Sequence, residues 1–100
     1  MKLMTKELER VLPKLYSQEK VEDPMCLVKY FQPWGSWTWF GIEYDPKERL
    51  FFGYVQGFEN ELGYFSLGEM ESVTGPMGLK IERDLYWKPQ RLSEIKAKEA

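Results

Sequence analysis

Apolar and polar residues alternate through the middle of the chain, and short clusters of turn residues interrupt the alternation. A period of two is typical of β-strands, because successive side chains point to opposite faces of a sheet. The pattern predicts strands at 25–31, 36–44, 50–58 and 62–65. In the second strand, one face carries Thr38, Phe40, Ile42 and Tyr44, and the other carries Trp37, Trp39, Gly41 and Glu43.

Short turns join these segments, which favours antiparallel neighbours because parallel strands need long crossovers. Asp45 and Pro46 take the first two positions of a predicted β-turn. If Tyr44 pairs with Leu50 across it, the register places Gly41 opposite Gly53, Trp39 opposite Val55, and Glu43 opposite Phe51. Two facing glycines would leave a shallow groove in the sheet, which either a helix backbone or a binding partner could fill.

Helical periodicity appears near both ends of the chain. Thr5 can cap a helix that carries Leu8, Val11, Leu12 and Leu15 on one face. Pro13 breaks or tightens it, so the helix is expected to end near Leu12 or one turn later at Tyr16. Ser66 and Glu69 form a capping-box pattern for a short helix to about residue 73. Residues 75–78 break that helix, 79–87 form either a short strand or an irregular segment, and Ser93 can cap a final turn.

These elements predict one α+β domain over residues 1–100, with an antiparallel meander of about four strands, an N-terminal helix and short C-terminal helices. The loop at 17–24 is expected to be exposed. The residues expected in the core are the apolar ones on the inner faces of these elements: Leu8, Val11, Leu12, Phe40, Ile42, Phe52, Tyr54 and Phe65.

Composition is that of a soluble globular protein, with 43% apolar and 30% charged residues. A single cysteine, Cys26, precludes an internal disulfide. Because the N-terminus lacks the apolar run of a secretory signal, we expect a cytoplasmic protein. No apolar stretch approaches the ~20 residues that cross a bilayer, so no membrane insertion is expected.

Catalytic chemistry finds little support in the residue types. The chain has no histidine, so neither a serine nor a cysteine nucleophile has its usual base. One cysteine cannot form a zinc site, and Cys26 reads as a buried structural residue. Four carboxylates could in principle act in pairs as in glycosidases, namely Glu43, Asp45, Glu59 and Glu61. We expect no enzyme activity, no cofactor and no metal, and keep a carboxylate hydrolase as the weakest hypothesis.

Charge is distributed unevenly. Residues 43–79 hold two basic residues against seven acidic ones, a net of −5, whereas the whole chain has a net of −2. An acidic segment opposes phosphate binding and suits docking onto a basic protein. We therefore predict a partner-binding surface in which aromatic residues lie beside an acidic rim: Trp37, Trp39, Glu43 and Phe51, with Glu48, Glu59 and Glu61. The alternatives are that the acids only maintain solubility, or that the aromatics stack on single-stranded nucleic acid.

The opening TKELERVLPKLYSQE, the pair WTWFGIEYDPKERLFFGYVQG and the segment ELGYFSLGEMESVTGPMGLKIERDLYWKP together resemble the bacterial and phage family called domain of unknown function 2958. The resemblance spans about Leu3 to Leu92. It implies no known activity and supplies no catalytic residues. It does imply a context of phages, plasmids and conjugative elements, near anti-restriction genes. The leading hypothesis is thus a non-enzymatic protein-binding factor of a mobile element, more specifically an inhibitor of a host restriction or CRISPR nuclease. The alternative is an accessory nucleic-acid-binding protein in element replication or transfer.

Overall fold

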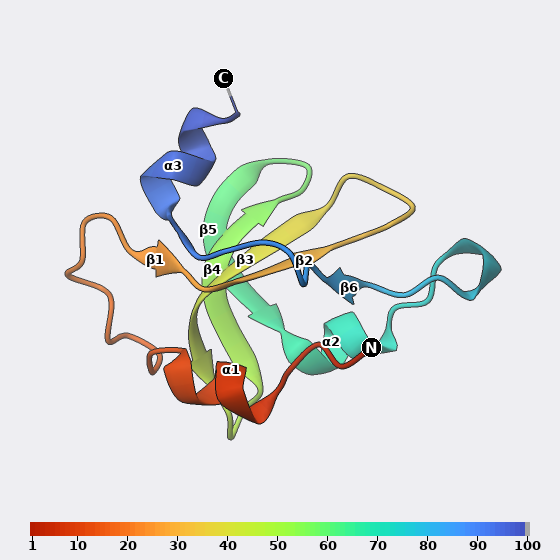
Figure 1. The fold of residues 1–100 in the computed structure, drawn as a ribbon, viewed down its shortest axis with the longest axis horizontal. Coiled ribbons are helices and arrows are strands. Elements are labelled where there is room, and N and C mark those ends of the chain that lie inside the picture. The colour runs from red at the N-terminus through yellow and green to blue at the C-terminus, as the bar shows by residue number, and fades with distance from the viewer. Residues whose placement is uncertain (100) are drawn as a thin grey trace.

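A five-stranded antiparallel sheet organises the protein (Figure 1). The computed structural model describes residues 1–99. The strand order is β5-β4-β3-β2-β6, and a separate two-stranded sheet pairs β1 with β7. In chain order the elements are α1 (Lys6–Val11), β1 (Met25–Cys26), β2 (Val28–Phe31), β3 (Thr38–Asp45), β4 (Leu50–Gln56), β5 (Asn60–Ser66), α2 (Leu67–Ser72), η1 (Pro76–Gly78), β6 (Glu82–Arg83), β7 (Gln90–Arg91) and α3 (Leu92–Ala97). The α+β class is confirmed.

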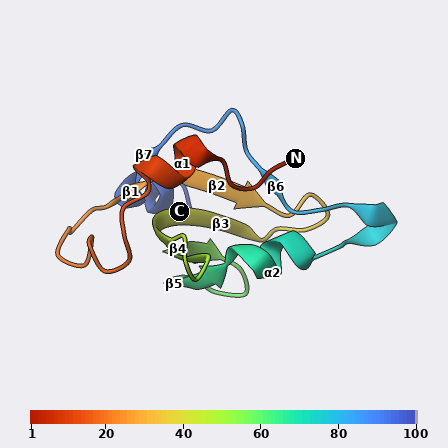
Figure 2. The same ribbon diagram turned by 90° about the horizontal axis from the view of Figure 1, so that it is seen from below.

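The meander runs through β2, β3, β4 and β5, as the short turns require. The expected first strand at 25–31 is split at Leu27, whose N–H donates to the Gly41 carbonyl. Before that residue the chain leaves the main sheet, and β1 pairs with β7 instead. Residues 79–87, expected to be either a short strand or irregular, contain β6. This strand pairs with β2 and is the fifth strand of the sheet. Figure 2 shows β2, β3, β4 and β5 following one another across the sheet, with α1 beyond β2 and α2 beside β5.

The register of β3 and β4 changes at a β-bulge. Gly41 lies opposite Gly53 and Trp39 opposite Val55, as expected, but the register shifts between Gly41 and Glu43. Beyond the bulge Glu43 pairs with Phe52. The expected pairs Tyr44 with Leu50 and Glu43 with Phe51 are therefore wrong, because a bulge adds one unpaired residue and reverses the face of everything after it.

Two apolar clusters cover the two faces of the sheet. On the first face the N-terminal segment, α1 and α2 pack on buried residues that include Val28, Tyr30, Tyr44, Phe51 and Phe65. On the second face α3 and Trp87 pack on Cys26, Phe40, Ile42 and Tyr54. The space over Gly41 is filled by the side chains of Val28 and Phe51, so the facing glycines leave no groove for a helix or a partner.

Most of the expected core residues are buried. Leu12, Phe40, Ile42, Tyr54 and Phe65 are confirmed. Leu8 and Phe52 are half-buried, and Val11 is exposed. The prediction failed for Val11 because α1 ends at this residue and reaches the sheet only through Leu8 and the following Leu12.

Side-chain caps start two of the helices as predicted. The Thr5 hydroxyl accepts from the Leu8 N–H at 3.1 Å, and the Ser66 hydroxyl accepts from the Glu69 N–H at 3.1 Å. Ser93 does not cap α3. Its N–H and hydroxyl donate instead to the carboxylate of Asp23 at 2.9 and 2.6 Å. These bonds lower the pKa of Asp23 below its ordinary value and tie the loop before β1 to α3, so the segment at 17–24 is less detached than expected.

Adjacent phenylalanines in β4 test which side of this strand is more deeply buried. Phe51 is 0% exposed and Phe52 is half-buried. We expect Phe51→Ala to lower the free energy of unfolding by about 3–5 kcal/mol, the usual cost of emptying a buried phenylalanine site. Phe52→Ala should cost less than half as much. Urea titration of both variants measures this, and a larger loss for Phe52→Ala would contradict the deeper burial of Phe51.

Candidate functional site

Aromatic side chains gather where the β2–β3 and β4–β5 turns meet. The Trp37 ring lies 5.9 Å from that of Trp39 and 5.2 Å from that of Phe58, measured between centroids. Trp37 lies against the backbone of Gly57, where a Cβ would collide with the indole. Phe58 is 95% exposed. It lies in the turn after β4, not in the strand as predicted. This exposure makes Phe58 the functional candidate that the strand pattern missed.

Acidic residues border this cluster on the same face. Trp39 pairs with Val55, and Val55 pairs with Glu61, so the three lie in a row across β3, β4 and β5. Glu59 is exposed in the turn, where its carbonyl accepts from the Gly57 N–H at 3.1 Å. We call this set the aromatic–acidic surface: Trp37, Trp39, Val55, Phe58, Glu59 and Glu61. Four of its members, two tryptophans and two glutamates, were predicted from the sequence.

Three other predicted members lie elsewhere. Phe51 is fully buried, with its ring 4.8 Å from Phe65 and 4.6 Å from Tyr44. Glu48 lies in the β3–β4 turn, at the end of the sheet opposite the β4–β5 turn (Figure 1). Glu43 is turned to the second face by the bulge. The predicted rim is therefore corrected to Glu59 and Glu61.

Glu43 forms a buried contact with the segment after α1. Its side chain is only 3% exposed. One carboxylate oxygen accepts from the Tyr16 N–H at 2.9 Å, and the other accepts from the Gln18 N–H at 2.7 Å. Tyr16 has a φ of 70°, in the left-handed region. The two N–H groups can thus approach one carboxylate. This contact fixes the loop to the sheet.

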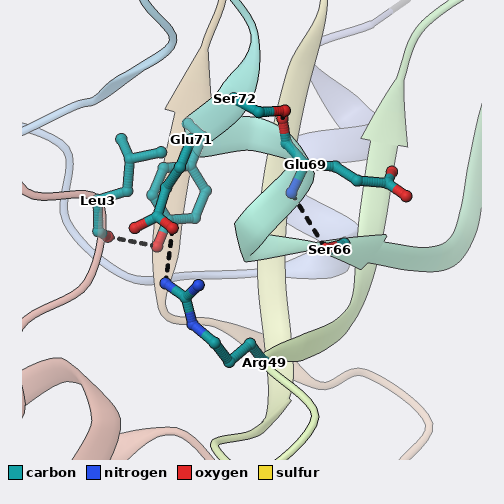
Figure 3. Close-up of polar contacts among 7 residues, drawn as sticks. Leu3, Arg49, Ser66, Glu69, Glu71 and Ser72 are labelled. Atoms are coloured by element: carbon teal, nitrogen blue, oxygen red, sulfur yellow. Dashed lines mark hydrogen bonds and ion pairs between the residues drawn. The ribbon is translucent and has the colours of Figure 1, made fainter.

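A cleft of about 600 Å³ lies between the N-terminal segment, the β3–β4 turn and α2. Arg49 in the turn, with a φ of 55°, donates to the Glu71 carboxylate on α2 at 2.6 Å. The Tyr30 hydroxyl, buried beneath, donates to the Leu3 carbonyl at 2.6 Å. Figure 3 shows Arg49 reaching Glu71 beside the capping contact of Ser66. The Arg49–Glu71 ion pair joins α2 to the hairpin across this cleft.

The carboxylates considered for hydrolysis lie in two separate places. Glu43 and Asp45 are near the β3–β4 turn, where an Asp45 oxygen accepts from the Lys47 N–H at 3.1 Å. Glu59 and Glu61 lie by the β4–β5 turn. Within residues 1–99, no group of three or more cysteine, aspartate and glutamate side chains could hold a metal ion. No helix in the same range is long and apolar enough to cross a membrane.

These features define a small α+β protein whose sheet presents aromatic and acidic side chains together at one end. The chain belongs to the DUF2958 family, described as proteins of unknown function, whose family model matches residues 3–100. This confirms the family resemblance. No curated protein and no solved structure matches the chain.

The Glu43 contact predicts a specific loss on substitution. Glu43→Gln keeps the size of the side chain but weakens two charge-assisted hydrogen bonds. We expect about 1–3 kcal/mol of destabilisation and faster hydrogen exchange at the Tyr16 and Gln18 amides. The matched control, Glu48→Gln, changes an exposed carboxylate and should stay within about 0.5 kcal/mol. Equal stability of the two variants would show that the contact contributes nothing.

Cys26 is predicted to be unreactive in the folded protein. The thiol is 0% exposed, and burial raises its pKa to about 12, with a smaller contribution from Asp23. At neutral pH it is protonated, whereas the thiolate is the reactive form. We expect an aromatic disulfide reagent to label Cys26 only as fast as the protein unfolds. Labelling at the rate of a free thiol without denaturant would contradict this.

Proposed function

We propose that this chain is a non-enzymatic protein-binding factor that uses the aromatic–acidic surface to bind a basic protein. The observation that supports it best is Phe58, a large apolar ring that is 95% exposed and packs edge-on against Trp37. Single exposed apolar residues are common on protein surfaces. Phe58 is not isolated, because its ring packs against half-buried Trp37, which in turn packs against half-buried Trp39.

The chemistry of the surface suits a protein interface. Tryptophan and phenylalanine are enriched at interfaces, and tryptophan is among the residues that most often dominate binding energy. Glu59 and Glu61 lie at the border, where charges mainly steer association and select a partner of opposite sign. The partner is accordingly proposed to present a basic surface around an apolar pocket.

Membership of the family supports a narrower form of the proposal. The resemblance noted in the sequence implies a context of phages and other mobile elements, for which a host defence enzyme is a natural target. Restriction and CRISPR nucleases bind DNA through clustered lysine and arginine side chains. An acidic rim could occupy such a surface in place of DNA. We propose inhibition of a defence nuclease as the specific role to test first.

Binding of single-stranded nucleic acid is the second candidate. Exposed aromatic rings stack on bases, and Phe58 and Trp37 offer such rings. Glu59 and Glu61 oppose it, because carboxylates repel the phosphates that normally provide most of the affinity. The two candidates differ in their sensitivity to nuclease digestion.

Capture from a bacterial lysate, before and after nuclease treatment, tests the proposal. A purified captured protein should bind Phe58→Ala and Trp39→Ala at least about 30-fold more weakly than the unchanged chain, the loss typical of a dominant interface residue. Tyr86→Ala is the matched control, since Tyr86 is an aromatic residue with 94% exposure away from this surface. Replacement of Glu59 and Glu61 by lysine should slow association and reduce its dependence on salt.

Two results would overturn the proposal. One is equal loss of binding in Tyr86→Ala and Phe58→Ala. The other is capture that vanishes on nuclease digestion while surviving the two charge reversals, which would establish the nucleic-acid candidate instead.

A further inference from the structure

A second cleft lies on the opposite face of the sheet from the aromatic–acidic surface. It occupies about 330 Å³ between the loop at 16–24 and the strands β3, β4 and β5. Its walls combine apolar and aromatic side chains with carboxylates, and the residues used below are Tyr16, Glu19, Glu22, Glu43, Phe52 and Tyr64. The cleft is independent of the proposed function, since it shares no residue with the aromatic–acidic surface.

The charge in this cleft is uncompensated. All of its charged lining residues are glutamates: Glu19, Glu22 and Glu43. Glu43 is 3% exposed, yet within residues 1–99 the ion pairs are Lys29–Asp84 and Arg49–Glu71, neither of which involves it. Buried charges are normally paired, so the two backbone N–H contacts leave Glu43 without a cation. A carboxylate has about four acceptor positions, and Glu43 uses two of them.

The aromatic side chains of the cleft favour a cation that carries an apolar stem. The rings of Phe52 and Tyr64 meet at 5.1 Å in an edge-on arrangement. Tyr16 and Tyr64 are both more than half exposed. Partial burial raises the pKa of Tyr64, and the nearby Tyr16 hydroxyl raises it further. Aromatic faces attract guanidinium and ammonium groups, and apolar walls accept an alkyl chain. Together with the carboxylates, this chemistry matches an arginine or lysine side chain.

The neighbouring strand indicates how such a side chain would arrive. β5 is the last strand of the sheet, and within the described chain nothing pairs with its outer edge. Leu62 and Tyr64 are exposed on β5 and line the cleft. An extended peptide that adds to a sheet edge gains main-chain hydrogen bonds, and its alternate side chains enter pockets on one face. A residue of such a peptide would lie next to Tyr64 and reach the carboxylates.

We propose that this cleft binds an arginine or lysine side chain carried by an extended segment of a partner protein, which pairs with the outer edge of β5. The charge of the cleft selects the side chain, and the free strand edge selects an extended backbone. A free alkyl amine and a second copy of this chain are the competing occupants.

Titration followed by amide NMR can separate these occupants. The probe is the blocked peptide acetyl-Thr-Val-Arg-Val-Thr-amide, and its matched control carries citrulline, the neutral isostere, in place of arginine. We expect saturable shifts at Phe52, Glu43 and along β5 with the arginine peptide, and none with the citrulline peptide. Agmatine tests the free amine.

Two double variants test whether the carboxylates of the cleft bind the arginine side chain. Glu19→Gln with Glu22→Gln removes two exposed carboxylates from the cleft without touching the Glu43 contact, and should weaken the arginine peptide about five-fold or more. Glu59→Gln with Glu61→Gln makes the same charge change on the opposite face and should leave peptide affinity unchanged. Glu59 and Glu61 are part of the aromatic–acidic surface. The two double variants therefore test the two proposals independently, and either proposal can fail without the other.

Four results would overturn the inference. They are an absence of saturable shifts up to millimolar peptide, equal binding of the citrulline peptide, binding of agmatine as tight as the peptide, and concentration-dependent shifts of β5 without any probe. The last of these would mean that a second copy occupies the edge.

Discussion

The carboxylate of Glu43 fixes the arrangement on which the rest of the fold depends. β2 pairs with β3 only as far as Gly41, so the remainder of β3 has no strand on that side. The chain after α1 lies along this part of β3 instead. The Tyr44 N–H donates to the Pro13 carbonyl at 2.9 Å, and the Glu43 carboxylate accepts from the N–H groups of Tyr16 and Gln18. The same loop continues to Asp23, which holds Ser93 and hence α3. The loop that Glu43 holds thus connects the N-terminal part of the chain to α3.

The bulge and the carboxylate depend on each other. A bulge leaves one residue outside the ladder of backbone hydrogen bonds, which is unfavourable by itself. Here it brings Ile42 and Glu43 to the same face, where Ile42 packs with α3 and Glu43 bonds the loop. It also turns Tyr44 toward the other cluster, where its ring lies 4.6 Å from that of Phe51. The charge-assisted contacts and the burial of an aromatic ring offset the lost ladder contact.

Local signals in the sequence were sufficient for much of this fold. The strand pattern, the turn at Asp45 and the caps at Thr5 and Ser66 each depend on neighbours within a few residues. The predicted register correctly placed Trp39 opposite Val55. Four of the six residues of the aromatic–acidic surface were also predicted. The misplaced residues follow from contacts between distant segments. No local pattern distinguishes a bulge at Ile42 from a regular strand, and that single residue accounts for the changed faces of Glu43 and Tyr44. Phe51 keeps the predicted face and is buried there because distant segments pack over it. β1 leaves the main sheet because it pairs with β7, and the paired residues Met25 and Arg91 are 66 positions apart in the sequence.

The lengths of the elements explain why both proposed sites lie where they do. Each α-helix has six residues and spans about 9 Å. β3 has eight residues and extends about 26 Å. Such helices cannot cover the length of the sheet on either face. On the first face the uncovered part carries the aromatic–acidic surface, and on the second it carries the cleft. β5 borders both, with Glu61 on one side and Tyr64 on the other, because alternate residues of an edge strand face opposite ways. Partial coverage by short helices therefore gives one strand two chemically different surfaces.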